Sequence, residues 1–185
     1  MLVASMNPCP CGYLFDPDRI CRCNSMQINK YYMKISGPIL DRIDIQVEVK
    51  PLKPIQVVEN KPSEPSSIIR ARVSRAREIQ QERLLKHGMT LNAMMNTELI
   101  KRYCDLDKKI KEILYNAVKY YKLTARSYFK TLKVARTIAD LEQRDRIVEE
   151  DVLEALSYRE VENILYKKTH YSNKQKKNPG IINVI

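Results

Sequence analysis

The chain has 185 residues, which allows one medium domain or a small domain with part of another, and its hydrophobic fraction of 44% can form a packed core. No apolar run approaches the roughly 20 residues that span a bilayer, and residues 1–8 lack the parts of a signal peptide, so a soluble cytoplasmic protein is expected. Lys and Arg total 33 against 22 acidic residues, and the net charge of +11 favours nucleic acid as a partner over a basic surface that only maintains solubility.

Residues 1–52 combine short apolar runs, a stretch rich in Cys, Pro and Gly, and one alternating segment. In residues 43–49 (IDIQVEV) the apolar side chains recur at every second position, which predicts a half-buried β-strand. Residues 53–67 are rich in proline and serine without periodicity, and we expect them to form a linker.

Residues 68–165 are expected to form a domain of amphipathic helices that bury their apolar faces against one another as a small bundle. Capping or acidic residues mark the expected starts of these helices, in chain order Ser66 or Ser67, Thr97, Asp107, Thr124 and Glu149. Gly88 is expected to end the first of them. Residues 166–185 are polar and basic and are expected to be a disordered or peripheral tail. The fold class predicted is therefore mainly α, with short strands confined to residues 1–52.

Four of the five cysteines lie within the first 23 residues, as two Cys-x-Cys pairs: Cys9 with Cys11, and Cys21 with Cys23. Four thiolates can bind zinc in a tetrahedron, and the prolines and Gly12 around them favour a turn-rich loop. Cys-x-x-Cys is the commoner zinc spacing, so reduced thiols in a structural loop are the alternative. Cys104 lies on an apolar helix face and is expected to be a small core residue.

Distinctive blocks occur in order along the chain: residues 6–13 are MNPCPCGY, 35–44 are ISGPILDRID, 124–128 are TARSY and 134–141 are VARTIADL. They resemble the magnesium-chelatase-like AAA+ ATPases of the competence protein ComM type, over roughly residues 2–159. The resemblance implies that residues 1–52 are the rear part of an AAA+ α/β core with a Cys-rich loop. It also implies that the helical domain is the lid of that ATPase.

Family members of the ComM type are ATP- and magnesium-dependent hexameric helicases that promote DNA branch migration, so the resemblance implies DNA and ring assembly. The chain has four glycines and no G-x-x-x-x-G-K-[ST] motif, and the acidic Walker B motif is also missing. We therefore expect a C-terminal fragment that begins within the ATPase core and does not hydrolyse ATP alone. The alternatives are a chelatase-type ATPase that remodels a protein partner, and a stand-alone zinc-knuckle module that binds nucleic acid.

The resemblance assigns roles to three residues. Asn7 occupies the sensor-1 position, where an amide orients the attacking water; the simpler interpretation is a turn asparagine before a proline. Arg42 resembles the arginine finger, acting in trans on nucleotide held by the neighbouring subunit; the simpler interpretation is an ion pair with Asp41 or Asp44. Arg126 resembles sensor 2, reaching nucleotide in its own subunit. Arg136, within the same helix, is expected to be a structural partner of acidic neighbours.

Overall fold

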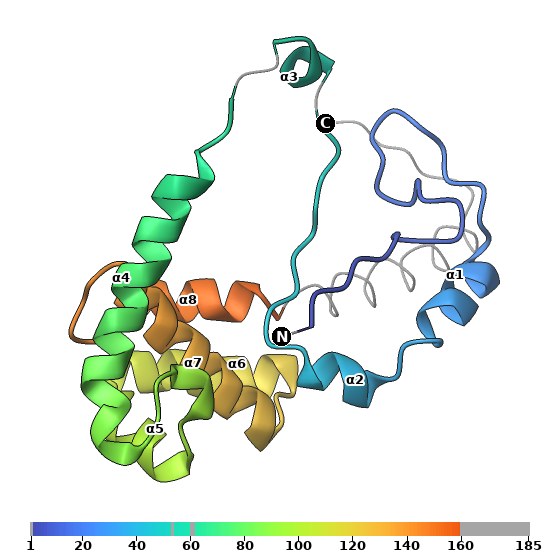
Figure 1. The fold of residues 1–185 in the computed structure, drawn as a ribbon. Helices are drawn as coiled ribbons and strands as arrows, with labels where there is room; N and C mark the ends of the chain where they lie inside the picture. Colours follow the sequence, from blue (N-terminus) through green and yellow to red (C-terminus); the bar gives the residue numbers. More distant parts are fainter. Residues whose placement is uncertain (1, 53, 60–61, 160–185) are drawn as a thin grey trace.

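The structure is a computed structural model that describes residues 2–52, 54–59 and 62–159, and these residues are mainly helical, without a β-strand (Figure 1). The predicted mainly α class is therefore confirmed. The first part of the chain contains α1 (Ser25–Tyr32), α2 (Gly37–Arg42) and α3 (Pro54–Glu59). The second part contains α4 (Ser66–Leu84), η1 (Leu85–His87), η2 (Asn92–Met94), α5 (Thr97–Tyr103), α6 (Lys108–Tyr121), α7 (Ala125–Leu141) and α8 (Glu149–Ser157).

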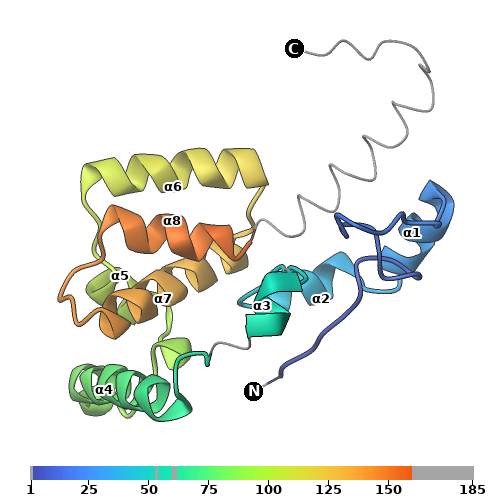
Figure 2. The same cartoon turned by 90° about the horizontal axis from the view of Figure 1, so that it is seen from above.

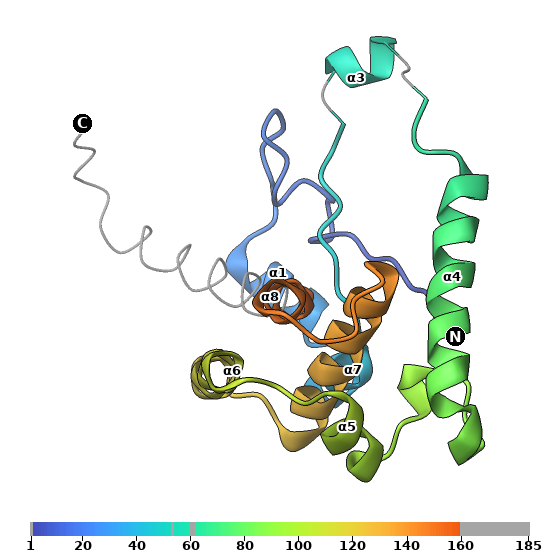
Figure 3. The same cartoon turned by 90° about the vertical axis from the view of Figure 1, so that its left-hand side faces the viewer.

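Helix α7 is the centre of a bundle formed by α4 to α8. It packs against α8 on one side and α4 on the other, and α5 and η2 also contact it, while α6 packs against α8 (Figure 2). Figure 3 looks along α8 and shows it beside both α6 and α7. The predicted bundle of helices is thus present, and α4, α5 and α8 are joined through α7.

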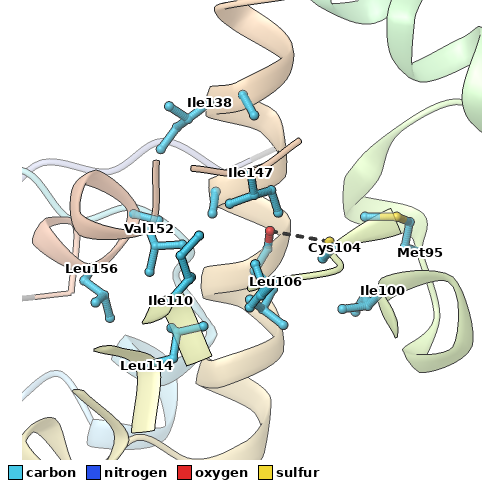
Figure 4. Close-up of a cluster of buried hydrophobic side chains, with 14 of the residues drawn as sticks. Met95, Ile100, Cys104, Leu106, Ile110, Leu114, Ile138, Ile147, Val152 and Leu156 are labelled. Atoms are coloured by element: carbon cyan, nitrogen blue, oxygen red, sulfur yellow. Dashed lines mark hydrogen bonds between the residues drawn. The ribbon is translucent and has the colours of Figure 1, made fainter. Parts of the chain in front are cut away.

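The core of the bundle comes from apolar side chains of α5, α6, α7 and α8, with Leu84 at the end of α4 (Figure 4). Val152 of α8 and Leu114 of α6 are almost completely buried, and Ile147, just before α8, closes the same cluster. Cys104 is buried among these side chains, and its thiol donates to the Leu132 carbonyl at 3.8 Å, so the prediction that it is a core residue is confirmed. Burial of a side chain such as Leu114 stabilises the fold by about 1.5–3 kcal/mol relative to leaving it exposed.

Local capping determines most helix starts. Asp107 accepts from the Ile110 N–H at 2.8 Å, and Thr124 accepts from the Ser127 N–H at 3.1 Å, as the sequence predicts. The cap of α5 is Asn96, whose side chain accepts from the Leu99 N–H, and not the predicted Thr97. Pro65 occupies the N-cap of α4, so neither Ser66 nor Ser67 caps it. Gly88 ends the η1 turn with a left-handed φ of 70°, a conformation that favours glycine.

The predicted β-strand at residues 43–49 is wrong for this structure. The segment is extended, but it lies beside no partner strand among the described residues. The Gln46 N–H donates to the Tyr158 carbonyl at 3.0 Å, which ties the segment to the end of α8 at one point. Ile45, Val47 and Val49 are each more than half exposed, because a strand buries a face only when a neighbouring strand or layer covers it.

Two other expectations for the first part of the chain need correction. Residues 1–52 contain α1 and α2, which were not expected from the sequence. The predicted linker, residues 53–67, contains the short helix α3 and the first two residues of α4. The last residues of the predicted helical domain and the tail at 166–185 lie outside the described residues.

Candidate functional site

The four clustered cysteines meet at one point in the Cys-rich loop. The Cys9 Sγ lies 3.3 Å from the Cys11 Sγ and 3.7 Å from the Cys21 Sγ, and the Cys11 and Cys21 sulfurs are 3.6 Å apart. With Cys23, all four sulfurs lie within 4.8 Å of one another. The two Cys-x-Cys pairs, separated by nine residues in sequence, therefore form a single cluster.

The spacing of these sulfurs fits a tetrahedral metal. Zinc–sulfur bonds of about 2.3 Å at tetrahedral angles place the sulfurs about 3.8 Å apart. The three separations among Cys9, Cys11 and Cys21, 3.3–3.7 Å, are slightly below this value, so a small expansion of the loop would admit the ion. Cys9 is fully buried while the other three are partly exposed, as expected for a site at the base of a surface loop. The residues present could hold a metal of the thiolate-binding class.

Local interactions hold the loop in this shape. The Gly12 N–H donates to the Cys9 carbonyl at 3.0 Å, and Gly12 has a φ of 83°, in the left-handed region that lets the chain turn directly after Cys11. The Tyr32 hydroxyl, on α1, donates to the Pro8 carbonyl. Asn24 follows Cys23 directly and caps α1 in a reciprocal capping box with Gln27. The second Cys pair is thereby attached to a helix start.

The thiols have different proton affinities. A hydrogen bond from the Tyr13 backbone lowers the pKa of Cys11 to about 6, whereas burial raises the pKa of Cys21 to about 12 and also raises the pKa of Cys23. Cys11 is therefore the first of these three thiolates to form. Since a metal binds the thiolate form of cysteine, a metal at this cluster would displace protons from Cys21 and Cys23 at neutral pH.

A second site joins the two parts of the chain at the start of α7. The Asp41 carboxylate, in α2, accepts hydrogen bonds from the hydroxyls of Ser127 and Thr124, the latter at 3.3 Å. Lys130, one turn further along α7, donates to the Arg42 carbonyl and forms an ion pair of 2.7 Å with Asp44. We call these contacts the α2–α7 junction. A carboxylate at a helix N-terminus is also favoured by the helix dipole.

Arg42 and Arg126 lie on the two elements of the α2–α7 junction. Both are exposed. The guanidinium of Arg42 donates to the Pro38 carbonyl at 2.7 Å. It forms no ion pair with Asp41, which is bound to α7, or with Asp44, which pairs with Lys130. Arg126 is in the first turn of α7, and no hydrogen bond or ion pair joins it to another described side chain. The two arginines predicted to contact nucleotide are therefore available to a ligand.

Asn7 lies apart from that junction, in the Cys-rich loop. It is exposed, and its side-chain amide is the nearest group to the position that a Cβ on Gly12 would take, at 4.0 Å. The structure thus places Asn7 next to the turn that carries the first two cysteines.

Sequence reasoning missed a buried charge network in the bundle. Asp140 is fully buried and accepts from Arg83 at 3.1 Å, from the Asn92 amide at 2.7 Å and from the Arg136 Nε at 3.1 Å. The role predicted for Arg136 as a structural partner of an acidic neighbour is confirmed by its ion pair with Asp140. The pairing of Arg83 with Asp140, 57 residues apart, has no local signal in the sequence.

Comparison with known protein families identifies the family to which the chain belongs. The family described as magnesium chelatase, subunit ChlI, matches residues 1–57, and its C-terminal region matches residues 63–159, which is more than half of the chain. The chain therefore belongs to the magnesium chelatase subunit ChlI family. None of the described helices is long and apolar enough to cross a membrane.

Curated relatives show which members of this family the chain is similar to. Competence protein ComM of Haemophilus influenzae is 39% identical over 90% of this chain and 32% of its own length. The uncharacterized protein YifB of Escherichia coli is 37% identical over 89% of this chain and 31% of its length. The uncharacterized protein Rv2897c of Mycobacterium tuberculosis is 33% identical over 86% and 31%, respectively. The chain spans about a third of the length of these relatives, and the resemblance to the ComM type is confirmed.

Proposed function

We propose that this chain supplies the C-terminal part of a magnesium-chelatase-like AAA+ ATPase that works, as a whole protein, as an ATP-driven hexameric DNA helicase or branch-migration motor. The observation that carries the proposal is the α2–α7 junction. It joins the family's two regions while leaving the guanidiniums of Arg42 and Arg126 exposed and without carboxylate partners among the described residues.

The roles proposed for the individual residues follow from the chemistry of phosphoryl transfer. ATP and Mg²⁺ are held by the nucleotide-binding part of the whole protein, and the charge that develops on the γ-phosphoryl oxygens is stabilised by guanidinium groups. In this proposal Arg42 acts on nucleotide in the neighbouring subunit. Arg126 contacts nucleotide in its own subunit when the lid closes, and Asn7 orients the attacking water. The α2–α7 junction keeps Arg42 and Arg126 in a fixed relation, so a movement of the lid is transmitted to the subunit boundary.

Substitution of Arg42 in the whole protein tests this division. Arg42→Ala should lower ATP hydrolysis by a factor of about 10³ or more, since arginine fingers contribute 10³–10⁵ in rate. Nucleotide binding should persist, because the phosphate cradle lies elsewhere. Arg77→Ala, which removes an exposed arginine of α4, is the matched control and should leave hydrolysis unchanged. Loss of nucleotide binding in Arg42→Ala would assign the residue to folding instead.

DNA is the proposed partner because the net charge is +11 and a homologue is a competence protein. The second candidate, favoured by the family's magnesium chelatase description, is an ATPase that remodels a protein. Binding of the whole protein to single-stranded and branched DNA at several salt concentrations separates them. Contacts with several phosphates give a steep linear fall of log K with log salt. An absence of salt-dependent DNA binding would favour the protein-remodelling alternative.

The Cys-rich loop is proposed to hold one zinc ion through Cys9, Cys11, Cys21 and Cys23. The support is that the sulfurs of Cys9, Cys11 and Cys21 lie 3.3–3.7 Å apart and that all four sulfurs lie within 4.8 Å of one another. When bound, zinc supplies a structural cross-link that would hold the loop in one conformation. Since Asn7 lies directly beside this loop, the cross-link would also restrict the position of the proposed sensor amide.

A further inference from the structure

A second concentration of positive charge lies on the helical bundle, away from the α2–α7 junction. A hollow of about 190 Å³ is lined by Arg83 of α4, Arg102 and Asp105 around the end of α5, Arg136 of α7, and Asp145 and Arg146 of the segment between α7 and α8. Four arginines from four separate parts of the bundle therefore line one hollow. Arg136 and Arg126 are ten residues apart on α7, which is about 15 Å along the helix axis. The hollow is thus separate from the proposed nucleotide-sensing arginines.

The inner wall of the hollow is rigid and positively charged. The side chains of Arg83 and Arg136 are 15% and 2% exposed, and both bind the fully buried carboxylate of Asp140. Arg136 also donates to the backbone carbonyls of Asp145, at 2.8 Å, and Arg144, which carry no charge. Two buried cations therefore share a single anion. Their positions are held by the bundle before any ligand arrives.

The outer rim carries two further arginines. Arg102 and Arg146 are exposed, and no carboxylate of a described residue lies within ion-pair distance of either. The Arg102 guanidinium lies over the ring of Tyr103, 5.6 Å from its centre, which keeps it near the hollow. The acidic Asp105 is 88% exposed and faces Lys111 at 3.8 Å. The four arginines and Lys111 carry five positive charges. The carboxylates of Asp105, Asp140 and Asp145 carry three negative charges, so two positive charges are uncompensated.

We propose that this hollow binds a phosphate group. Guanidinium forks match the oxygens of phosphate in charge and geometry, and a bidentate pair is stronger than a neutral hydrogen bond. The volume is below the roughly 300–1,000 Å³ of pockets for drug-sized molecules, so the site fits a single anionic group and not a whole nucleotide. Two sources share this chemistry: a free phosphate ion and one phosphate of a nucleic-acid backbone. The proposal is independent of the function proposed above, because none of its residues belongs to the α2–α7 junction.

The test is a titration of the ¹⁵N-labelled chain with sodium phosphate at low ionic strength, followed by the backbone amide signals of Asp145, Arg146 and Ile147. The expected result is a saturable shift of these signals. Arg146→Gln and Arg102→Gln should each raise the dissociation constant by about tenfold or more, the scale of one lost charge-assisted hydrogen bond. Arg77→Gln removes the same charge from an exposed site on α4 and should leave the constant within about twofold of the original. Thermal unfolding of each variant checks that the bundle is intact.

A single-stranded oligonucleotide then identifies the source. Weaker oligonucleotide binding in Arg102→Gln and Arg146→Gln, relative to Arg77→Gln, supports the site with a backbone phosphate as the ligand. Phosphate binding that depends on Arg102 and Arg146 without any effect on the oligonucleotide supports the site with free phosphate as the ligand. The proposal is overturned by shifts that do not saturate with either probe, or by equal weakening in all three variants.

Discussion

Replacement of Asp140 by Asn is the perturbation whose size the structure determines best. The carboxylate is fully buried and is the shared counter-charge of Arg83 and Arg136. Asparagine keeps the shape of the side chain but leaves two guanidiniums inside the bundle without an anion. Loss of one partner of a buried ion pair typically costs about 3–5 kcal/mol. Domains of this size are stable by about 5–15 kcal/mol, so Asp140→Asn should remove a large fraction of the free energy of unfolding.

Urea denaturation followed by far-UV circular dichroism measures this loss, because the chain has no tryptophan for fluorescence. The thermal midpoint should fall by about 12 °C or more, at about 4–8 °C for each kcal/mol. Asp105→Asn is the control, since that side chain is 88% exposed and its change should stay within about 0.5 kcal/mol. Adding Arg83→Met to Asp140→Asn should restore part of the stability by removing one orphaned charge. A loss below about 1 kcal/mol in Asp140→Asn would refute the reasoning.

Two further predictions concern the other sites. Purified without chelator, the chain should contain about one zinc per molecule, measured by mass spectrometry of the metal. Cys9→Ser should lower the zinc content, whereas Cys104→Ser, in the core, should not. Less than about half an equivalent of zinc in the unsubstituted chain would exclude the site. Asp41→Asn should lower the free energy of unfolding by about 1 kcal/mol, because it removes the negative charge that lies at the N-terminus of α7. Asp18→Asn, in the exposed loop, should have little effect. Equal effects of the two substitutions would show that the α2–α7 junction contributes nothing in solution.

The helix starts show what sequence can predict. Asp107 and Thr124 cap α6 and α7 because the hydrogen bond that each makes joins residues three apart, so its signal is local. The same signal misleads by one residue at α5, where Asn96 and Thr97 are neighbouring capping types and the structure uses Asn96. Helix α1 had a usable signal, since Asn24 and Gln27 have the spacing of a capping box.

Features that depend on residues far apart in the chain could not be predicted from local sequence patterns. Arg83 and Asp140 meet only after α4 and α7 have packed, and many alternative pairings were open to each in the sequence. The alternation in residues 43–49 is typical of a half-buried strand. A strand also requires a neighbouring strand, and none of the described residues provides one. Conversely, the cysteine cluster was predictable, because two closely spaced pairs on a turn-rich loop can come together without help from the rest of the fold.

The most direct test of the proposed motor mixes two inactive forms of the whole protein. One form carries Arg42→Ala, and the other lacks the phosphate-binding lysine of its Walker loop but keeps Arg42. If Arg42 acts on the neighbouring subunit, mixed rings contain sites with an intact Walker loop beside an intact Arg42, and ATP hydrolysis should return. The same mixture made with Arg126→Ala should stay inactive, because Arg126 serves its own subunit. Failure of the Arg42→Ala mixture to regain hydrolysis, under conditions where mixed rings form, would contradict the account.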